Sequence, residues 1–358
     1  MDNHPPELNE LGWSDWFEQR MAGKPTETIA RVAAVDRSLL TLVDQTGPFR
    51  AKLAGSYLQR ARPSPERPCV GDWVCLERQS GDDVAVVHAL LERRTCLRRK
   101  LAGNVIGFQM IAANVDYAVI VQSCHFDFNL KRLERYLVMV AEGGAEPYIL
   151  LTKTDLLDPA GTVLAEQLAA MRAAGITAPI LTLSNVTREG VDDLERRLLP
   201  GQTYCFVGSS GVGKSTLINH LLGREVQETK AVSVTGEGRH TTVRRELIRL
   251  AGGALVIDNP GMREFGVLDA EEGLESSYAD LTALASGCRY GDCTHTNEPG
   301  CAVREAVASG EMGQERVANY QKLREESAFN QMSYAEKRKK DRAWGKYLKS
   351  AKKDLEDK

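Results

Sequence analysis

The sequence predicts an α/β domain with a mainly parallel sheet, placed between a small all-β barrel and a mainly helical C-terminal region. Between residues 115 and 270, near-continuous apolar strands alternate with helical segments, and this pattern is typical of a doubly wound sheet. Ahead of it, from about residue 26 to 92, short apolar runs alternate with turn residues. Residues 275–330 are helical in pattern around a cluster of cysteines. These three observations give the fold class.

The 358 residues divide into six consecutive parts, which we take from shifts in composition and pattern. The first 25 residues are polar and carry only a weak signal for a short helix. The six parts are an N-terminal extension (1–25), the barrel (26–95), a basic linker (96–114), the α/β domain (115–272), a metal-binding helical region (273–330) and a basic C-terminal tail (331–358).

The barrel is predicted from four apolar runs and a proline-rich break. The runs are TIARVAAV, SLLTLV, GDWVCLER and DVAVVHAL, and the break is RPSPERP. About five short strands of this kind form a compact barrel, and both an oligonucleotide/oligosaccharide-binding fold and an SH3-like barrel are open. The next segment, ERRTCLRRK, holds Arg93, Arg94, Arg98, Arg99 and Lys100. It is either a solvated linker or a contact with an RNA backbone.

Composition and charge exclude some classes of protein. Hydrophobic residues make up 42% and charged residues 27% of the chain, and a net charge of −3 excludes a polycation. No stretch approaches the roughly 18 consecutive apolar residues of a membrane span. The N-terminal MDNHPPELNELGW lacks the basic-then-apolar layout of a signal peptide, so we expect a cytoplasmic protein without membrane contact. Three of the eight cysteines lie within residues 288–301, which favours a metal site and reduced thiols over disulfides.

The strongest motif is a phosphate-binding loop. Residues 208–215 read GSSGVGKS and match G-x-x-x-x-G-K-[ST] between the strand TYCFVG and a helix. The glycines allow backbone N–H groups to turn toward phosphate oxygens, and the helix N-terminus adds its positive end. Lys214 would reach the β and γ phosphates, and the Ser215 hydroxyl would bind Mg²⁺. The predicted nucleotide contacts here are Gly208, Ser209, Ser210, Gly211, Val212, Gly213, Lys214, Ser215 and Thr216.

Three further motifs supply the rest of a guanine-nucleotide site. Lys153 and Asp155 follow the strand PYILL, where the carboxylate can accept hydrogen bonds from guanine N1–H and the 2-amino group, which adenine lacks. Ser184, in LTLSN, is the residue expected beside the base. In DNPG, Asp258 would hold Mg²⁺ through water, and the Gly261 N–H would sense the γ-phosphate. Thr242, or less favourably Thr241, would complete the Mg²⁺ shell.

The order of these motifs is rotated, because the base-reading motifs precede the phosphate loop. A site requires its parts to be close in space, whatever their order in the chain. The chain resembles the circularly permuted GTPases of the RsgA (YjeQ/YloQ) family, maturation factors of the small ribosomal subunit. The resemblance covers nearly all of residues 26–330, through the barrel, TKTD, GSSGVGKS, GRHTT, DNPGMREF and CRYGDCTHTNEPGC. It implies GTP and GDP as ligands, ribosome-stimulated hydrolysis of GTP, and contacts with ribosomal RNA, and we expect a monomer.

The chain departs from the family pattern at two places, and a third position bears on hydrolysis. Thr152 stands where N-K-x-D has asparagine, which weakens the scaffold of the base loop but leaves Asp155. Asn259 stands where a small hydroxyl residue is more usual, and we expect little effect. Met262 follows the DNPG glycine, where other GTPases often have the glutamine that orients water. His240 is the candidate to replace it in catalysis; the alternative is a solvated loop residue.

The cysteine cluster has the spacing of a metal site. Cys288-x₄-Cys293-x-His295-x₅-Cys301 offers three thiolates and one imidazole. Four such ligands suit a closed tetrahedral Zn²⁺ site without room for a catalytic water, so we expect one structural zinc ion.

The basic tail and the overall function leave alternatives. Residues 337–353 hold nine Lys or Arg against one acid, and they either lie on ribosomal RNA phosphates or only aid solubility. Two other functions are an ATP-dependent enzyme, such as a small-molecule kinase, and an RNA-binding module with an inert nucleotide site. K-x-D after a strand opposes the first, and the intact Gly213-Lys214-Ser215 opposes the second.

Overall fold

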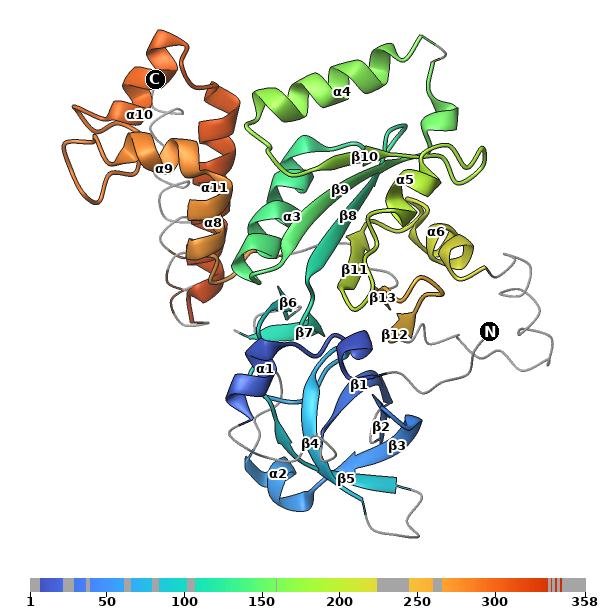
Figure 1. Ribbon diagram of the computed structural model, residues 1–358. Helices are drawn as coiled ribbons and strands as arrows, with labels where there is room; N and C mark the ends of the chain where they lie inside the picture. Colours follow the sequence, from blue (N-terminus) through green and yellow to red (C-terminus); the bar gives the residue numbers. More distant parts are fainter. Residues whose placement is uncertain are drawn as a thin grey trace.

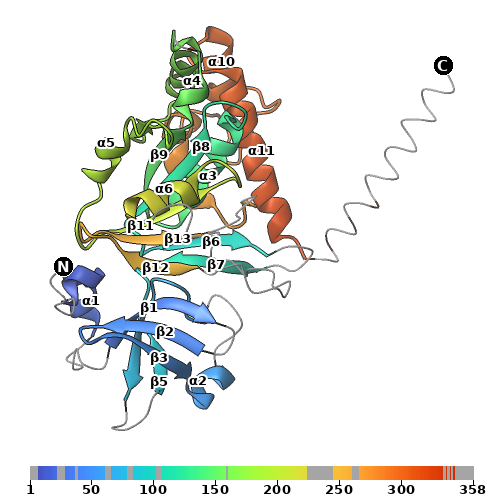
Figure 2. The ribbon, with the colours of Figure 1, turned by 90° about the vertical axis from the view of Figure 1, so that its right-hand side faces the viewer.

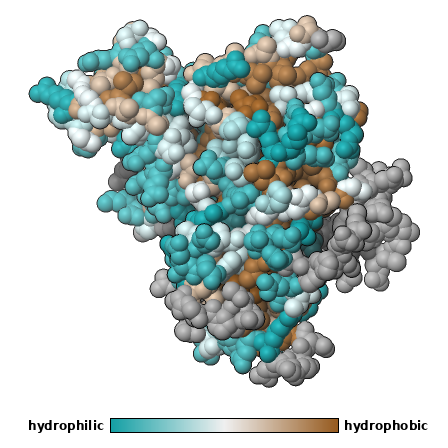
Figure 3. Space-filling model, viewed as in Figure 1, coloured by the Kyte–Doolittle hydropathy of each residue, from teal (hydrophilic) through white to brown (hydrophobic). Residues whose placement is uncertain are grey.

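The computed structural model describes residues 7–21, 29–36, 39–60, 66–78, 84–101, 107–158, 160–223, 245–259, 266–333 and positions 336, 339 and 342. In this part of the chain a five-stranded barrel lies below an α/β sheet, and a helical region lies beside that sheet (Figure 1). None of the described helices is long and apolar enough to cross a membrane. The space-filling view shows hydrophilic residues spread over this face, with apolar ones gathered around α4 and the strands beside it (Figure 3).

The barrel closes on itself in the order β1-β2-β3-β5-β4, with a further pairing between β1 and β4. Strands β3 and β5 are parallel, whereas the other neighbours are antiparallel. This order matches the oligonucleotide/oligosaccharide-binding fold, the first of the two barrels that the sequence left open. Val32, Leu42 and Val87 are fully buried at its centre. The elements are β1 (Ile29–Asp36), β2 (Leu39–Asp44), β3 (Gly47–Leu53), α2 (Gly55–Arg60), β4 (Trp73–Glu77) and β5 (Val84–Leu90).

The N-terminal extension forms η1 (Asn9–Leu11) and the short helix α1 (Asp15–Arg20). Phe17 of α1 packs against the buried Trp73 of the barrel, with ring centroids 6.0 Å apart. The buried guanidinium of Arg31 donates to the carbonyls of Leu11, Gly71 and Asn114, and burial lowers its pKa to about 10. One side chain therefore joins the extension, the barrel and the chain that enters the α/β domain.

The segment expected as a solvated basic linker instead forms a two-stranded antiparallel ribbon, β6 (Cys96–Lys100) and β7 (Phe108–Ala113). Arg98 lies over the ring of Phe108 and pairs with Glu142 at 3.2 Å. Arg93 pairs with buried Asp72 at 2.7 Å, and Arg94 pairs with Asp116. The linker interpretation is wrong here because these arginines bind acids of neighbouring elements. Arg99 and Lys100 are outside these acid pairs, and Arg99 donates to the Gln109 side chain at 2.9 and 2.7 Å, so the alternative of an RNA contact stays a prediction.

The α/β sheet runs β10-β9-β8-β11-β13, and these five strands are parallel. Strand β12 is antiparallel to β13 and to β1, so this sheet and the barrel are continuous. Alternate residues of β8 face opposite sides: Ile120 packs in the cluster with α3 and α4, and Val119 in the cluster with α5 and α6. The strands are β8 (Tyr117–Ser123), β9 (Glu146–Thr152), β10 (Ile180–Thr182), β11 (Thr203–Gly208), β12 (Glu246–Arg249) and β13 (Leu255–Asp258). The helices are α3 (Leu130–Glu142), η3 (Thr154–Leu156), α4 (Thr162–Ala173), α5 (Val191–Glu195) and α6 (Lys214–Leu221).

The C-terminal helical region shares a hydrophobic cluster with the sheet, because Leu274 and Leu281 pack together with residues of α3. Figure 2 shows α11 alongside the sheet, with the β6–β7 ribbon between the sheet and the barrel. Helix α8 approaches α3 closely at Gly273, where a Cβ atom would lie 2.2 Å from the Val138 carbonyl oxygen. The helices are α8 (Glu271–Ser277), α9 (Ala279–Ala285), α10 (Ala302–Ser309) and α11 (Gln314–Gln331).

A buried polar network also crosses this interface. Glu134 of α3 accepts hydrogen bonds from the Tyr278 hydroxyl at 3.1 Å and from the Asn319 amide at 2.7 Å. Arg316 pairs with Glu134 at 3.4 Å and with Asp280 at 2.7 Å. The network favours one orientation of the helical region on α3, because its hydrogen bonds are satisfied only in that orientation.

Candidate functional site

The phosphate-binding loop follows β11 in the conformation that its glycines allow. Gly208 has φ 144° and lies so close to β8 that a Cβ atom would be 2.2 Å from the Val121 carbonyl oxygen. Gly213 has φ 97° and precedes α6, whose first turn carries Ser215 and Thr216. Ser209, Ser210, Gly211 and Val212 form the turn between these two glycines. The backbone therefore has the shape that the motif predicts.

Lys214 is folded back over this loop. Its Nζ donates to the carbonyls of Gly208 at 2.7 Å and Ser209 at 2.5 Å, and the residue is 6% exposed. Burial lowers the pKa of Lys214, and the charges of Asp258 and Asp127 oppose that shift. The ammonium group thus lies at the loop, within the field of two carboxylates.

Asp258 ends β13, the parallel neighbour of β11, and therefore reaches the same edge of the sheet as the loop. Burial raises the pKa of Asp258, and the charge of Lys214 opposes this. Its Oδ1 atom is buried and has no hydrogen-bond partner among the described residues. A buried carboxylate oxygen without a partner is costly, and it fits a position that binds a cation or its water.

The base-reading residues gather at the ends of β9 and β10. Lys153 has φ 62°, and this left-handed turn leads into η3, which contains Asp155. The Ser184 hydroxyl donates to Asp155 Oδ1 at 2.5 Å and accepts from the backbone N–H groups of Val186 and Thr187 at 3.0 and 3.1 Å. Ser184 thus holds one oxygen of the Asp155 carboxylate, so the predicted LTLSN motif contacts the predicted K-x-D motif.

Two hydrogen bonds join this base loop to the phosphate loop. The buried Thr152 hydroxyl donates to the Val212 carbonyl at 2.6 Å. The Asn185 amide donates to the Gly213 carbonyl at 3.1 Å. Thr152 therefore links the two loops directly, although we expected it to weaken the scaffold. Asn185 was missed by the sequence reasoning, and its only signal there was its place beside Ser184.

Other predicted residues lie outside the described part of the chain. His240, Thr241 and Thr242 fall within residues 224–244, and Gly261 and Met262 fall within residues 260–265. Residues 337–353 of the tail are described only at positions 339 and 342.

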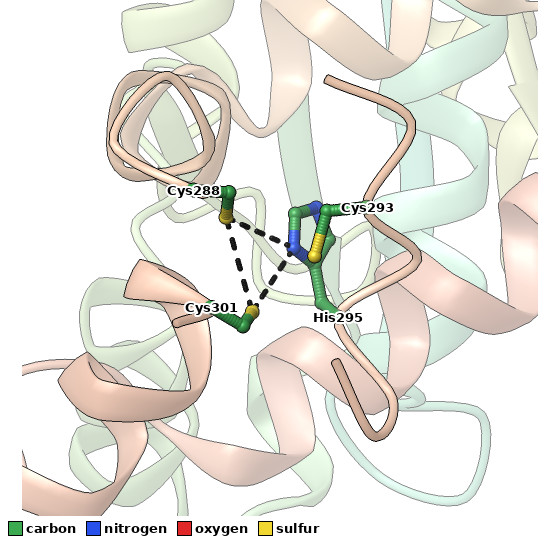
Figure 4. A group of neighbouring side chains, drawn as sticks. All are labelled: Cys288, Cys293, His295 and Cys301. Atoms are coloured by element: carbon green, nitrogen blue, oxygen red, sulfur yellow. Dashed lines mark hydrogen bonds between the residues drawn. The ribbon is translucent and has the colours of Figure 1, made fainter. Parts of the chain in front are cut away.

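The four predicted metal ligands come together between α9 and α10. The ligand atoms of Cys288, Cys293, His295 and Cys301 all lie within 4.8 Å of one another, and the side chains point toward one centre (Figure 4). His295 Nδ1 is 3.7 Å from Cys288 Sγ and 3.5 Å from Cys301 Sγ, and the two sulfur atoms are 3.8 Å apart. The cluster is a metal-binding site of three thiols and one imidazole.

Helix α11 holds the loop that carries two of these ligands. Gln321 donates to the His295 carbonyl at 2.9 Å, and Arg324 donates to the Cys293 carbonyl at 3.3 Å. Within the loop, Glu298 accepts from the N–H groups of Thr294 and Thr296, both at 2.9 Å. These supporting residues were not predicted, because one glutamine and one arginine on a polar helix give no signal in the sequence.

The fold and the site define a P-loop GTPase with a circularly permuted chain order, since the base loop after β9 precedes the phosphate loop after β11. The family model of the RsgA GTPase matches residues 90–268. The chain is 42% identical over 304 residues to the "Small ribosomal subunit biogenesis GTPase RsgA 2" of Lactiplantibacillus plantarum, covering 85% of this chain and 84% of that protein. The chain belongs to the RsgA GTPase family and is a GTP hydrolase.

Two solved structures share the fold. One is YjeQ from Thermotoga maritima, with a TM-score of 0.61, 25% identity, and coverage of 83% of this chain and 96% of that chain. The other is YloQ, described as a circularly permuted GTPase, with a TM-score of 0.60, 25% identity, and coverage of 87% of this chain and all of that chain. These similarities confirm the predicted arrangement of barrel, permuted GTPase domain and helical region, and they leave no support for an inert nucleotide site or a small-molecule kinase.

Proposed function

We propose that this GTPase binds the small ribosomal subunit and hydrolyses GTP late in its maturation, with turnover stimulated by the subunit. The observation that carries the nucleotide part is the contact between the two halves of the site, through Thr152 to Val212 and Asn185 to Gly213. The partner is inferred from the names of the relatives, such as the small-ribosomal-subunit biogenesis GTPase of Lactiplantibacillus plantarum.

In the proposed nucleotide complex, Asp155 accepts hydrogen bonds from guanine N1–H and the 2-amino group while Ser184 holds its other side. Lys153 contributes its stem to the face of the base. The backbone N–H groups of residues 208–216 surround the α and β phosphates, and Lys214 moves from the loop carbonyls to the β and γ phosphates. That move replaces the neutral carbonyl acceptors of the ammonium group with anionic phosphate oxygens.

Mg²⁺ fits the residues at the phosphate end of this site. Ser215 would bind it directly and Asp258 through water, and the unpartnered Oδ1 of Asp258 supports this. When bound, Mg²⁺ neutralises charge on the β and γ phosphate oxygens. Thr242 is proposed to complete the shell, and the Gly261 N–H to sense the γ-phosphate.

Hydrolysis requires a group that orients the attacking water. Met262 cannot orient water, because its thioether is only a weak hydrogen-bond acceptor, so another residue must do so. We propose His240 for this role. His240→Ala should abolish subunit-stimulated turnover and leave GTP binding intact, as measured by single-turnover hydrolysis and by equilibrium binding. Unchanged stimulated turnover would exclude His240.

Asp155→Asn tests the base-reading role by exchanging one acceptor for a donor. Guanine offers N1–H and a 2-amino donor, whereas xanthine offers N1–H and a 2-oxo acceptor, which match the oxygen and nitrogen of asparagine. We expect affinity for GTP to fall by a factor on the order of 10⁴ and affinity for xanthosine triphosphate to rise. Gain of xanthosine binding shows that the variant is folded. Unchanged GTP affinity would contradict the assignment.

Turnover with small subunits, with large subunits and with neither tests the partner. We expect stimulation by small subunits alone, and Lys214→Ala is the matched inactive control. Equal stimulation by both subunits would contradict the proposal.

We further propose that residues 337–353 contact ribosomal RNA. In that case deletion of residues 337–358 flattens the salt dependence of subunit binding.

The cysteine cluster is proposed to hold one structural Zn²⁺. Tetrahedral zinc with Zn–S of about 2.3 Å and Zn–N of about 2.0 Å places its sulfur ligands about 3.8 Å apart and sulfur and nitrogen about 3.5 Å apart. Here the Sγ atoms of Cys288 and Cys301 are 3.8 Å apart and lie 3.7 and 3.5 Å from His295 Nδ1. With Cys293 included, all four ligand atoms lie within 4.8 Å of one another. All four positions are taken by protein atoms, so the site leaves no place for a catalytic water.

A further inference from the structure

Asn259, the residue that departs from the family pattern beside Asp258, has a specific partner. It is fully buried, and its Oδ1 accepts a hydrogen bond from Arg245 Nε at 2.8 Å. Arg245 Nη1 donates in turn to the carbonyl of Met110, in β7, at 3.0 Å. One guanidinium therefore joins the end of β13, the start of β12 and the ribbon between barrel and GTPase domain.

The strand that follows Arg245 extends this connection. Glu246, its neighbour in β12, pairs across the sheet with Asp258 on one side and with Ala34 of the barrel strand β1 on the other. Both acceptors of Arg245 are neutral oxygens, and burial together with the charge of Arg99 lowers the pKa of this guanidinium. Burying a charge that has only neutral acceptors costs free energy that an apolar side chain would not cost. A role in positioning the neighbouring strands therefore explains Arg245 better than packing alone.

Asp258 depends on the backbone of Asn259 for part of its orientation, because the Asn259 N–H donates to its carboxylate while Oδ1 has no partner among the described residues. The next residue, Asn259, is fixed by the guanidinium. A hydroxyl on Cβ ends one bond earlier than the Oδ1 of asparagine, and this extra reach gives a physical reason for the departure at position 259.

We propose that Arg245 and Asn259 are positioning residues of GTP hydrolysis, which hold the Asp258 end of β13 against β12 and β7. The rate of turnover then depends on how the barrel is packed against the GTPase domain. This rests on the proposed function only in taking Asp258 as a residue of the Mg²⁺–GTP site. Neither residue touches the reacting atoms; both act through the place of Asp258.

The test uses the full-length protein and a double-mutant cycle. Asn259→Leu removes the acceptor at similar volume, Arg245→Met removes the guanidinium but keeps the stem, and the third variant combines both. The matched control is Arg249→Met, at the other end of β12, where the arginine pairs with Glu10 at 3.0 Å and both side chains are about two-fifths exposed. Each variant is assayed for GDP affinity, kcat with small subunits, and the Mg²⁺ concentration that half-saturates binding of a non-hydrolysable GTP analogue.

We expect each single variant to lower kcat about tenfold and raise the Mg²⁺ requirement about fivefold, with GDP affinity within about twofold. The double variant should be no worse than the more damaged single variant, because both changes break the same bond. The control should match the parent protein. Unchanged kcat and Mg²⁺ requirement, or effects that add fully in the double variant, would overturn the proposal. Failure of the parent protein to bind GTP would instead overturn the proposed function.

Discussion

The metal cluster and the nucleotide site are built in opposite ways from one chain. The four metal ligands lie within fourteen consecutive residues, from Cys288 to Cys301, and their ligand atoms come within 4.8 Å of one another. The nucleotide site joins Thr152 to Val212, 60 positions apart, through one hydrogen bond of 2.6 Å. We expect the local site to depend on the proposed ion to hold a short segment, whereas the distant site depends on the sheet to bring its loops together.

This difference teaches where each site is vulnerable. The loop of the metal cluster has few apolar residues and only a few hydrogen bonds from α11, so we expect loss of the proposed metal to unfold it. The nucleotide loops follow four strands of a five-stranded parallel sheet with a hydrophobic cluster on each face, so single changes there should shift binding and leave the fold intact. The following predictions test that contrast.

The largest effect is expected at the metal cluster. Replacing both Cys293 and Cys301 by alanine should reduce zinc from about one ion per chain to none, because two ligands cannot replace four. Zinc binding of about 10–16 kcal/mol would be lost, and residues 279–310 should lose hydrogen-exchange protection. Elemental analysis and exchange measured by mass spectrometry check this. Full protection in the metal-free variant would show that the helices hold the loop alone. GDP binding is the control and should persist.

At the link between the two loops we expect a smaller loss. Thr152→Val keeps the shape of the side chain but leaves the buried Val212 carbonyl without this donor, at a cost of about 2 kcal/mol. GDP affinity should fall roughly thirtyfold. Isothermal titration measures it, and Thr152→Ser, which keeps the hydroxyl, should bind almost as well as the parent. Equal affinities for the valine and serine variants would mean that the bond has no part in positioning.

Ser184→Ala should have a weaker effect still. The hydroxyl donates to Asp155 at 2.5 Å. Ser184 is buried but Asp155 is exposed, so water can supply the carboxylate with a replacement donor. We expect a loss of about 1 kcal/mol in GDP affinity, and no change in affinity for a phosphate-only ligand such as pyrophosphate. Loss of pyrophosphate binding would show that Ser184 supports the whole loop rather than the base.

The smallest predicted effect concerns pH at the interface of the helical region. Burial alone would raise the pKa of Asp280, but the hydrogen bonds and charge of Arg316 outweigh it, so the pKa lies below its ordinary value. A carboxyl with a lowered pKa stabilises the folded state above its ordinary pKa and loses that contribution as the pH falls through the folded value. Asp280→Asn should therefore lower stability at neutral pH and lose less stability between neutral pH and about pH 3, as measured by urea unfolding. Parallel curves for the two proteins would contradict this.

Sequence reasoning succeeded where chemistry is local. GSSGVGKS requires glycines at set positions because Gly208 packs against the Val121 carbonyl, and the pattern predicts this without knowledge of the neighbour. The cysteine spacing predicts four ligands in one place for the same reason. The apolar strands between residues 115 and 270 were predicted because burial on both faces removes their polar alternation.

It failed where a side chain's partner lies far away. The arginine run after residue 92 looked solvated, since the sequence does not show that Asp72 and Glu142 lie opposite Arg93 and Arg98. The choice between two barrels depended on whether β3 pairs with β5 in parallel, which strand periodicity leaves open. Whether threonine at position 152 weakens or supports the base loop depends on its hydrogen bond to the Val212 carbonyl, which the sequence does not show.

The sequence by itself therefore determined the chemistry of this protein: a loop that fits phosphate, a carboxylate after a buried strand, and three thiols and one imidazole at metal spacing. These follow from residue types and short intervals, whose geometry the backbone constrains directly. Only the tertiary structure decided which carbonyl Thr152 meets, which acids neutralise the arginines, and that Arg245 reaches Asn259 and β7 at once. Contacts of that kind depend on how the sheet, ribbon and barrel are packed, and no interval along the chain encodes them locally.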